Sequence, residues 1–237
     1  MKLGVLLCDH VQPHLQADFG DYAAMFAAII STSGIAVELQ FFDVVNGEFP
    51  AHIDVCDCYI TTGSKYGVND DLVWLAQLTE FVLCLHRAKK GFVGICFGHQ
   101  LIAHALGGSV EKSTKGWGIG IAKADIVKDT QWMVPKSQSI NLVVSHQDQI
   151  STLPTDAEVL LTSDFCPFSM YKIGEHFLGI QGHPEFTRIY SYALMDSRRD
   201  RIPAGTITAA VGSLSWKTDD VLMMKWLLLF LQRTVQV

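Results

Sequence analysis

A cysteine flanked by glycines is the residue of this chain best placed to act as a nucleophile. Residues 91–95 form a short apolar run that predicts a buried strand, Cys96 follows it, and a helix is expected over residues 101–106. A sharp turn between a strand and a helix lifts a side chain out of the sheet and points the first N–H groups of the helix at it. Gly94 and Gly98 leave room for such a turn. A helix N-terminus and a nearby imidazole both favour the thiolate, so we expect Cys96 to be a covalent nucleophile in a nucleophile elbow.

A second segment supplies the base that such a thiol needs. His183 and Glu185 lie two residues apart, with Pro184 between them. Side chains two apart on an extended segment project to the same side, so the imidazole and the carboxylate can meet. His183 would take the thiol proton and return it to a leaving amine, while Glu185 would fix the tautomer and orientation of the ring. We therefore predict a catalytic triad of Cys96, His183 and Glu185 that the fold brings together.

Four motifs, in this order along the chain, resemble those of one enzyme family. Residues 61–64, Thr-Thr-Gly-Ser, look like its oxyanion loop, and residues 144–148, Val-Ser-His-Gln-Asp, look like its glutamine-contacting segment. The segments Gly-Ile-Cys-Phe-Gly-His-Gln around Cys96 and Gly-His-Pro-Glu around His183 closely resemble those of the class I glutamine amidotransferases, the triad glutaminases that include the glutaminase part of GMP synthase. The resemblance implies the open α/β sheet of that family and a hydrolase that needs no metal and no organic cofactor.

The resemblance also implies which other residues form the site. The backbone N–H groups of Gly63 and Phe97 would face the developing oxyanion, where one donor typically contributes about 3 kcal/mol. The residues that would bind the glutamyl group are Ser64, Gln100, Ser145 and His146. His146 is the main competitor of His183 as the base, but its segment resembles the one that contacts substrate, so we expect His183 to be the base.

The residues that carry the resemblance would bind the glutamyl half of a substrate, and they do not indicate what the leaving group is. If the leaving group is ammonia, the chain is a glutaminase, and a synthetase partner would receive the ammonia. If the leaving group is an amino acid or peptide amine, the chain is a stand-alone γ-glutamyl peptidase. A third alternative is a non-catalytic regulatory protein with the same fold, which the intact set of Cys96, His183 and Glu185 disfavours.

Size and composition limit the remaining classes of function. At 237 residues the chain fits one α/β domain over residues 1–237, large enough to bury roughly three quarters of its unfolded surface. A formal net charge of −6 without a long Lys/Arg block argues against nucleic acid or an anionic membrane as a partner. The apolar run over residues 221–231 is about half a membrane span, so we expect a buried helix there. Six cysteines without a secretory signal indicate a reducing compartment, and we expect the cytoplasm.

Apolar runs alternate with helical patterns in the first hundred residues. Helices are expected at residues 22–30 and 72–88, and strands at residues 3–7, 37–42, 54–60 and 92–95. This alternation predicts an α/β fold with an open, mostly parallel, doubly wound sheet. Functional loops collect at the carboxyl ends of the strands in such a sheet, so the loop after Thr61 and Cys96 would share one edge.

From about residue 118 the apolar segments become shorter and richer in turns. Strands are expected at residues 119–126, 140–144, 159–161 and 176–180. These segments predict a smaller antiparallel extension of the sheet. The last fifty residues predict helices at residues 190–196, 208–214 and 219–232. No internal repeat or linker interrupts the pattern, so we expect a single domain.

Overall fold

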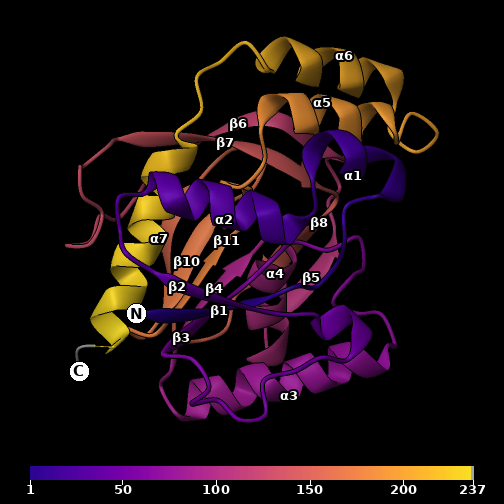
Figure 1. Ribbon diagram of the computed structural model, residues 1–237. Coiled ribbons are helices and arrows are strands. Elements are labelled where there is room, and N and C mark those ends of the chain that lie inside the picture. Colours follow the sequence, from indigo (N-terminus) through magenta and orange to yellow (C-terminus); the bar gives the residue numbers. More distant parts are fainter. Residues whose placement is uncertain (236–237) are drawn as a thin grey trace.

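The computed structural model, which describes residues 1–235, is built around a nine-stranded sheet (Figure 1). Its strand order is β2-β1-β3-β4-β11-β10-β9-β6-β7. Neighbouring strands are parallel from β2 to β11 and antiparallel from β11 to β7. In that order the strands are Glu38–Phe42, Lys2–Leu6, Cys58–Thr61, Gly91–Ile95, Phe177–Ile180, Met170–Ile173, Ala157–Thr162, Gly118–Ile126 and Ser139–His146. The predicted fold class, a mostly parallel α/β sheet with an antiparallel extension, is confirmed.

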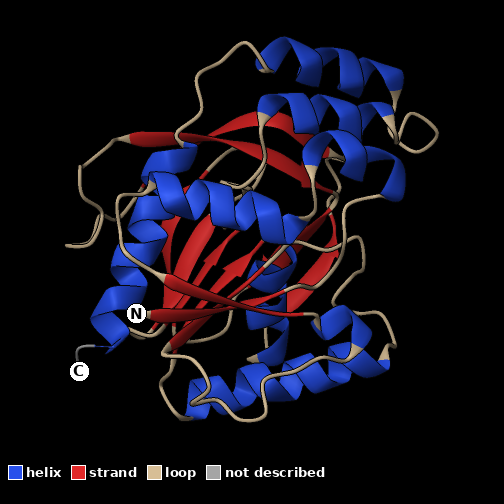
Figure 2. Ribbon diagram, viewed as in Figure 1, coloured by secondary structure: helices blue, strands red, loops and turns tan. Residues whose placement is uncertain are grey.

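Helices cover both faces of the parallel part of the sheet (Figure 2). On one face α7 (Asp220–Val235) packs against α2 (Tyr22–Thr32) and against β3 and β4. On the other face α4 (Phe97–Ala105) packs against β4, β11 and α3 (Val73–Arg87). The inner strands β1, β3, β4 and β11 are therefore buried on both sides, which explains their nearly continuous apolar sequences, whereas the edge strand β2 is only partly buried.

The core consists of two clusters, one on each face, and successive strand residues enter them alternately. Leu3 and Val5 of β1 join the cluster beneath α2 and α7, whereas Leu6 joins the cluster beneath α3 and α4. In β4, Val93 joins the first cluster and Phe92 the second. This period of two is what a strand geometry imposes on side chains.

Three helices gather at one end of the molecule, at the top of Figure 1. These are α1 (Pro13–Phe19), α5 (Arg188–Asp196) and α6 (Ala204–Ser213). The last two pack against the antiparallel strands, α6 on β6 and α5 on β6 and β7. The rings of Phe19 and Tyr190 meet edge to face at 5.4 Å and connect α1 to α5.

Several boundaries differ from the sequence predictions. The strand expected at residues 54–60 begins only at Cys58, because residues 54–57 form turns and bends. The helix after Cys96 starts at Phe97, four residues earlier than predicted. The elements that the sequence analysis missed are α1, a 3₁₀ turn at Val44–Asn46, β10 and the small antiparallel sheet of β5 (Ser109–Lys112) and β8 (Asp148–Thr152).

The C-terminal apolar run is a buried helix, as predicted. Met223, Met224 and Trp226 of α7 have no exposed surface. Within residues 1–235, the length and apolar composition that a membrane-spanning helix requires are not found in any helix.

Candidate active site

Cys96 lies at a strained turn between β4 and α4. Its φ of 50° and ψ of −92° place a non-glycine residue in a backbone region that typically costs about 1–3 kcal/mol. The cysteine N–H donates to the carbonyl of Ile180 at 2.8 Å, which ties the turn to the end of β11. This is the geometry predicted for a nucleophile elbow, with the side chain raised at the start of a helix.

The glycines on either side of Cys96 are required by close packing. A Cβ at Gly94 would lie 2.3 Å from the carbonyl carbon of Gly98. A Cβ at Gly98 would lie 1.8 Å from Oγ1 of Thr61. The elbow is therefore pressed against both its own helix and the end of β3, and any larger residue at these two positions would move Cys96.

His183 and Glu185 form a buried pair beside the elbow. Nδ1 of His183 and Oε1 of Glu185 are 2.8 Å apart, and these side chains are 3% and 0% exposed. The His183 N–H donates to the carbonyl of Val143 at 2.8 Å, and the ring stacks on Phe186 at 4.0 Å with an interplanar angle of 3°. Backbone, carboxylate and stacking contacts thus fix the imidazole.

Gly63 lies against both His183 and Cys96. A Cβ built on Gly63 would be 2.7 Å from Cε1 of His183 and 3.7 Å from Cβ of Cys96. Burial lowers the pKa of His183, but the Glu185 carboxylate and the Cys96 sulfur raise it more, so its pKa lies above the usual value. A protonated imidazole beside the thiol favours the thiolate, which is the reactive form.

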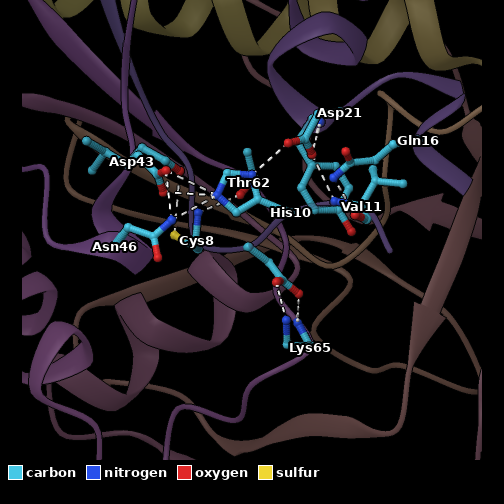
Figure 3. Close-up of polar contacts among 12 residues, drawn as sticks. Cys8, His10, Val11, Gln16, Asp21, Asp43, Asn46, Thr62 and Lys65 are labelled. Carbon is cyan, nitrogen blue, oxygen red and sulfur yellow. Dashed lines mark hydrogen bonds and ion pairs between the residues drawn. The ribbon is translucent and has the colours of Figure 1, made fainter. Parts of the chain in front are cut away.

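The loop that carries Gly63 is held from β1. The N–H and Nζ of Lys65 bind the two carboxylate oxygens of Asp9 at 2.9 and 2.7 Å, and Asp9 is only 4% exposed. The N–H of Cys8 donates to Oγ1 of Thr62 at 2.9 Å (Figure 3). The chain after β1 therefore positions the predicted oxyanion loop.

Phe97 is the first residue of α4, and no side chain caps this helix. Its N–H is one of the groups that an α-helix leaves without an intrahelical partner. The loop after β3 and the start of α4 thus bring the backbone of Gly63 and Phe97 to the same cysteine, and their role as an oxyanion hole stays a prediction.

The four residues predicted to bind the glutamyl group all line clefts at Cys96, within an open volume of about 1060 Å³. Gln100 is nearly buried and donates to the carbonyl of Asp148 at 2.8 Å. The hydroxyl of Ser64 accepts from the N–H of Tyr66 at 3.1 Å. The hydroxyl of Ser145 accepts from Nη1 of Arg198 at 3.0 Å.

His146 differs from His183 in its partners. Its Nδ1 lies 3.1 Å from the carbonyl oxygen of Asp148, not from a carboxylate. Burial is the main cause that lowers the pKa of His146 to about 4; the hydrogen bond to that carbonyl opposes it, and the charge of His183 acts in the same direction as burial. His146 is therefore neutral near pH 7, and the carboxylate-paired ring is His183.

Another histidine lies just beyond the ends of β1 and β2 (Figure 3). Nδ1 of His10 lies 2.6 Å from Asp21 and its Nε2 lies 3.1 Å from Asp43. Asp21 also accepts from the N–H groups of Val11 and Tyr22. This arrangement ties the start of α2 to the end of β2, and it leaves His10 outside the cluster around Cys96.

Three residues of the site were missed by the sequence analysis. Gln181 donates from Nε2 to Sγ of Cys96 at 3.3 Å, and its position next to the His183 motif was a usable signal. Asp9 follows β1, and the rule that functional loops follow strand ends could have found it. Arg198 follows α5 and reaches the cleft from far along the chain, with no local pattern to indicate it.

Comparison with known proteins places this chain in a family. The family model described as "Glutamine amidotransferase class-I" matches residues 75–189, which include Cys96, His183 and Glu185. "Gamma-glutamyl peptidase 3" of Arabidopsis thaliana is 33% identical over 184 residues, 74% of this chain and 74% of that protein. The chain belongs to the class I glutamine amidotransferase family. It is a cysteine amidohydrolase of that family, as the sequence predicted.

One solved structure and one further relative are also similar to this chain. A glutamine amidotransferase of Thermotoga maritima has a crystal structure that superposes with a TM-score of 0.76 at 20% identity, covering 100% of this chain and 98% of that chain. A glutamine-hydrolysing GMP synthase subunit of Sulfurisphaera tokodaii is 34% identical over 130 residues, 54% of this chain and 67% of that protein. The first similarity agrees with the fold described above.

Proposed function

We propose that this protein hydrolyses γ-glutamyl amide bonds, with Cys96 as nucleophile, His183 as base and acid, and Glu185 as the group that orients His183. Sγ of Cys96 attacks the γ-carbonyl carbon, and the N–H groups of Gly63 and Phe97 stabilise the oxyanion. His183 transfers a proton to the leaving amine as the C–N bond breaks, which leaves a glutamyl thioester on Cys96. Water then attacks the thioester, with His183 accepting its proton, and releases glutamate and the free thiol.

One observation carries this proposal. Cys96 occupies a strained backbone conformation directly beside a buried imidazole–carboxylate pair, with the backbone of Gly63 and the start of α4 next to it. Strain of this kind persists where the surroundings impose it, and it clusters at active sites. Every proton transfer in the scheme is assigned to a group of this chain.

The substrate that we favour is a γ-glutamyl amino acid or peptide. The named γ-glutamyl peptidases 3 and 4 of Arabidopsis thaliana are 33% and 32% identical over 74% and 75% of this chain. The match to the GMP synthase protein covers only 54% of it. That smaller match supports a second candidate, a glutaminase that delivers ammonia to a synthetase partner.

Kinetics of the purified protein distinguish these two candidates. A γ-glutamyl dipeptide should be hydrolysed with a kcat/KM well above that for free glutamine, and Cys96→Ala should abolish both reactions. Cys84→Ala is the matched control, since Cys84 is only half-buried on α3, away from the cleft. A higher kcat/KM for glutamine, or glutamine hydrolysis that requires an added synthetase, would favour the ammonia-supplying candidate.

Covalent labelling tests whether the protein is an enzyme of this type at all. A thiol-reactive glutamine analogue should modify Cys96 in preference to the other five cysteines. Peptide mapping after labelling identifies the modified residue. If Cys96 stays unlabelled and the protein hydrolyses no γ-glutamyl compound, the result would favour the alternative of a non-catalytic regulatory protein with this fold.

A further inference from the structure

The cleft at Cys96 has two sides that differ in their residues. A wider side is lined by Gln100, His146 and Asp148, which come from the segments predicted to bind the glutamyl group. A narrower recess is lined by Tyr22, His183, Phe186 and Leu194. Cys96, Ser145 and Arg198 border both sides, as do Ser64 and Lys65.

The proposed chemistry assigns the recess to the leaving group, and the inference below rests on that proposed function. His183 must reach the nitrogen of the leaving amine to protonate it. His183 lines the narrower recess and not the wider side. The glutamyl half therefore extends into the wider side, and the amine half extends into the recess.

Arg198 brings an uncompensated positive charge to this recess. Its Nη1 donates to the neutral hydroxyl of Ser145 at 3.0 Å, and its side chain is half-buried. In the part of the chain that the structure describes, Arg198 forms no ion pair with a carboxylate. A partly desolvated guanidinium gains most from a planar anion, which it binds through two parallel hydrogen bonds.

The other charged groups around the recess do not satisfy Arg198. Lys65 also lines the recess, but its Nζ is paired with Asp9 at 2.7 Å. Among the described residues that line the recess there is no Asp or Glu. Burial and the nearby positive charge of Arg201 lower the pKa of Arg198, while the Tyr22 hydroxyl and the Cys96 sulfur act in the opposite direction.

We propose that Arg198 binds a carboxylate of the leaving amino acid or peptide, with Ser145 fixing the guanidinium. The chain would then be selective for γ-glutamyl amino acids and peptides that carry a free carboxylate. Arg198 and Lys65 would repel a cationic leaving group, so γ-glutamyl polyamines would be poor substrates. Arg198 lies beyond residue 189, where the match to the family ends, which is consistent with a feature of this chain and not of the shared catalytic core.

A pair of substrates isolates this contact. γ-Glutamyl-alanine and γ-glutamyl-alaninamide share the glutamyl half and differ in the terminal carboxylate. The wild-type protein should prefer γ-glutamyl-alanine by about 10- to 100-fold in kcat/KM, the range expected for a hydrogen bond between charged groups. Arg198→Gln should reduce this ratio to near 1, and Ser145→Ala should reduce it partly.

Arg199→Gln is the matched control, because this substitution removes the same charge from the same turn. Arg199 is exposed, and its Nε lies 2.7 Å from Oδ1 of Asp196. The control variant should keep the wild-type ratio, and thermal melts establish that all variants are folded. An unchanged ratio in Arg198→Gln, or equal rates for the two substrates in the wild type, would overturn the role of Arg198. Loss of activity on both substrates with an unlabelled Cys96 would instead overturn the proposed function itself.

Discussion

Replacing Gly63 with alanine should disturb the imidazole of His183 while keeping every hydrogen-bonding group. The new Cβ would lie 2.7 Å from Cε1 of His183, whereas carbon atoms in contact are about 3.5–4.0 Å apart. The ring and the loop must therefore separate by about 1 Å, and a misplacement of that size typically costs on the order of 100-fold in rate. The same Cβ would lie an ordinary 3.7 Å from Cβ of Cys96, so the nucleophile itself has room.

Steady-state hydrolysis of a γ-glutamyl dipeptide measures this effect, and we expect the loss mainly in kcat because the glutamyl-binding side is untouched. Gly212→Ala is a suitable control, since a Cβ there would meet nothing within 4 Å. A folded Gly63→Ala protein with kcat within threefold of the wild type would refute the placement of Gly63 against the catalytic ring. A crystal structure of the variant would show whether His183 has moved.

Three further predictions follow from the contacts around the site. Cys96→Ala and His183→Ala should each abolish turnover, and the double variant should lose little more, because residues that act in one step are not additive; additive losses in kcat would separate their roles. Asp9→Asn should lower kcat about tenfold, since Lys65 and the oxyanion loop lose a buried charged partner; a change in KM alone would contradict this. Burial lowers the pKa of His10, but its two carboxylate partners raise it more. Its stabilising effect is thus complete below the unfolded pKa of about 6.5 and is lost as pH rises through the higher folded value. The difference in Tm between the wild type and His10→Gln should be larger at about pH 5.5 than at about pH 9, and a difference that grows with pH would be inconsistent with the charged pair.

The parallel half of the fold was predictable because its signals are local. Apolar runs such as Leu3 to Leu7 mark strands buried on both faces, and the helical runs between them require a parallel sheet. That topology also predicts that Cys96 lies at the edge of the sheet formed by the carboxyl ends of the parallel strands. The small sheet of β5 and β8 was missed because its strands are short and β5 is mostly exposed, which removes the apolar pattern.

The residues of the site likewise fall into those that local motifs predict and those that they do not. Cys96, His183 and Glu185 belong to short motifs, and the structure brings them together, although their catalytic roles remain predictions. Arg198 acts through a contact that joins distant parts of the chain, so no spacing in the sequence indicates it, whereas Asp9 directly follows β1 and its partner Lys65 lies far along the chain. Long-range contacts of this kind depend on where α5 and β1 end in space. The positions of those ends could be predicted from the sequence only approximately.

The measurement that tests the central claim most directly is a search for the glutamyl thioester. The protein would be mixed with a γ-glutamyl dipeptide, quenched in acid within the first turnover and analysed by intact and peptide mass spectrometry. We predict one added glutamyl group on the peptide that contains Cys96, and none in Cys96→Ala. Turnover without an adduct on Cys96, or a Cys96→Ala protein with activity within tenfold of the wild type, would contradict the account.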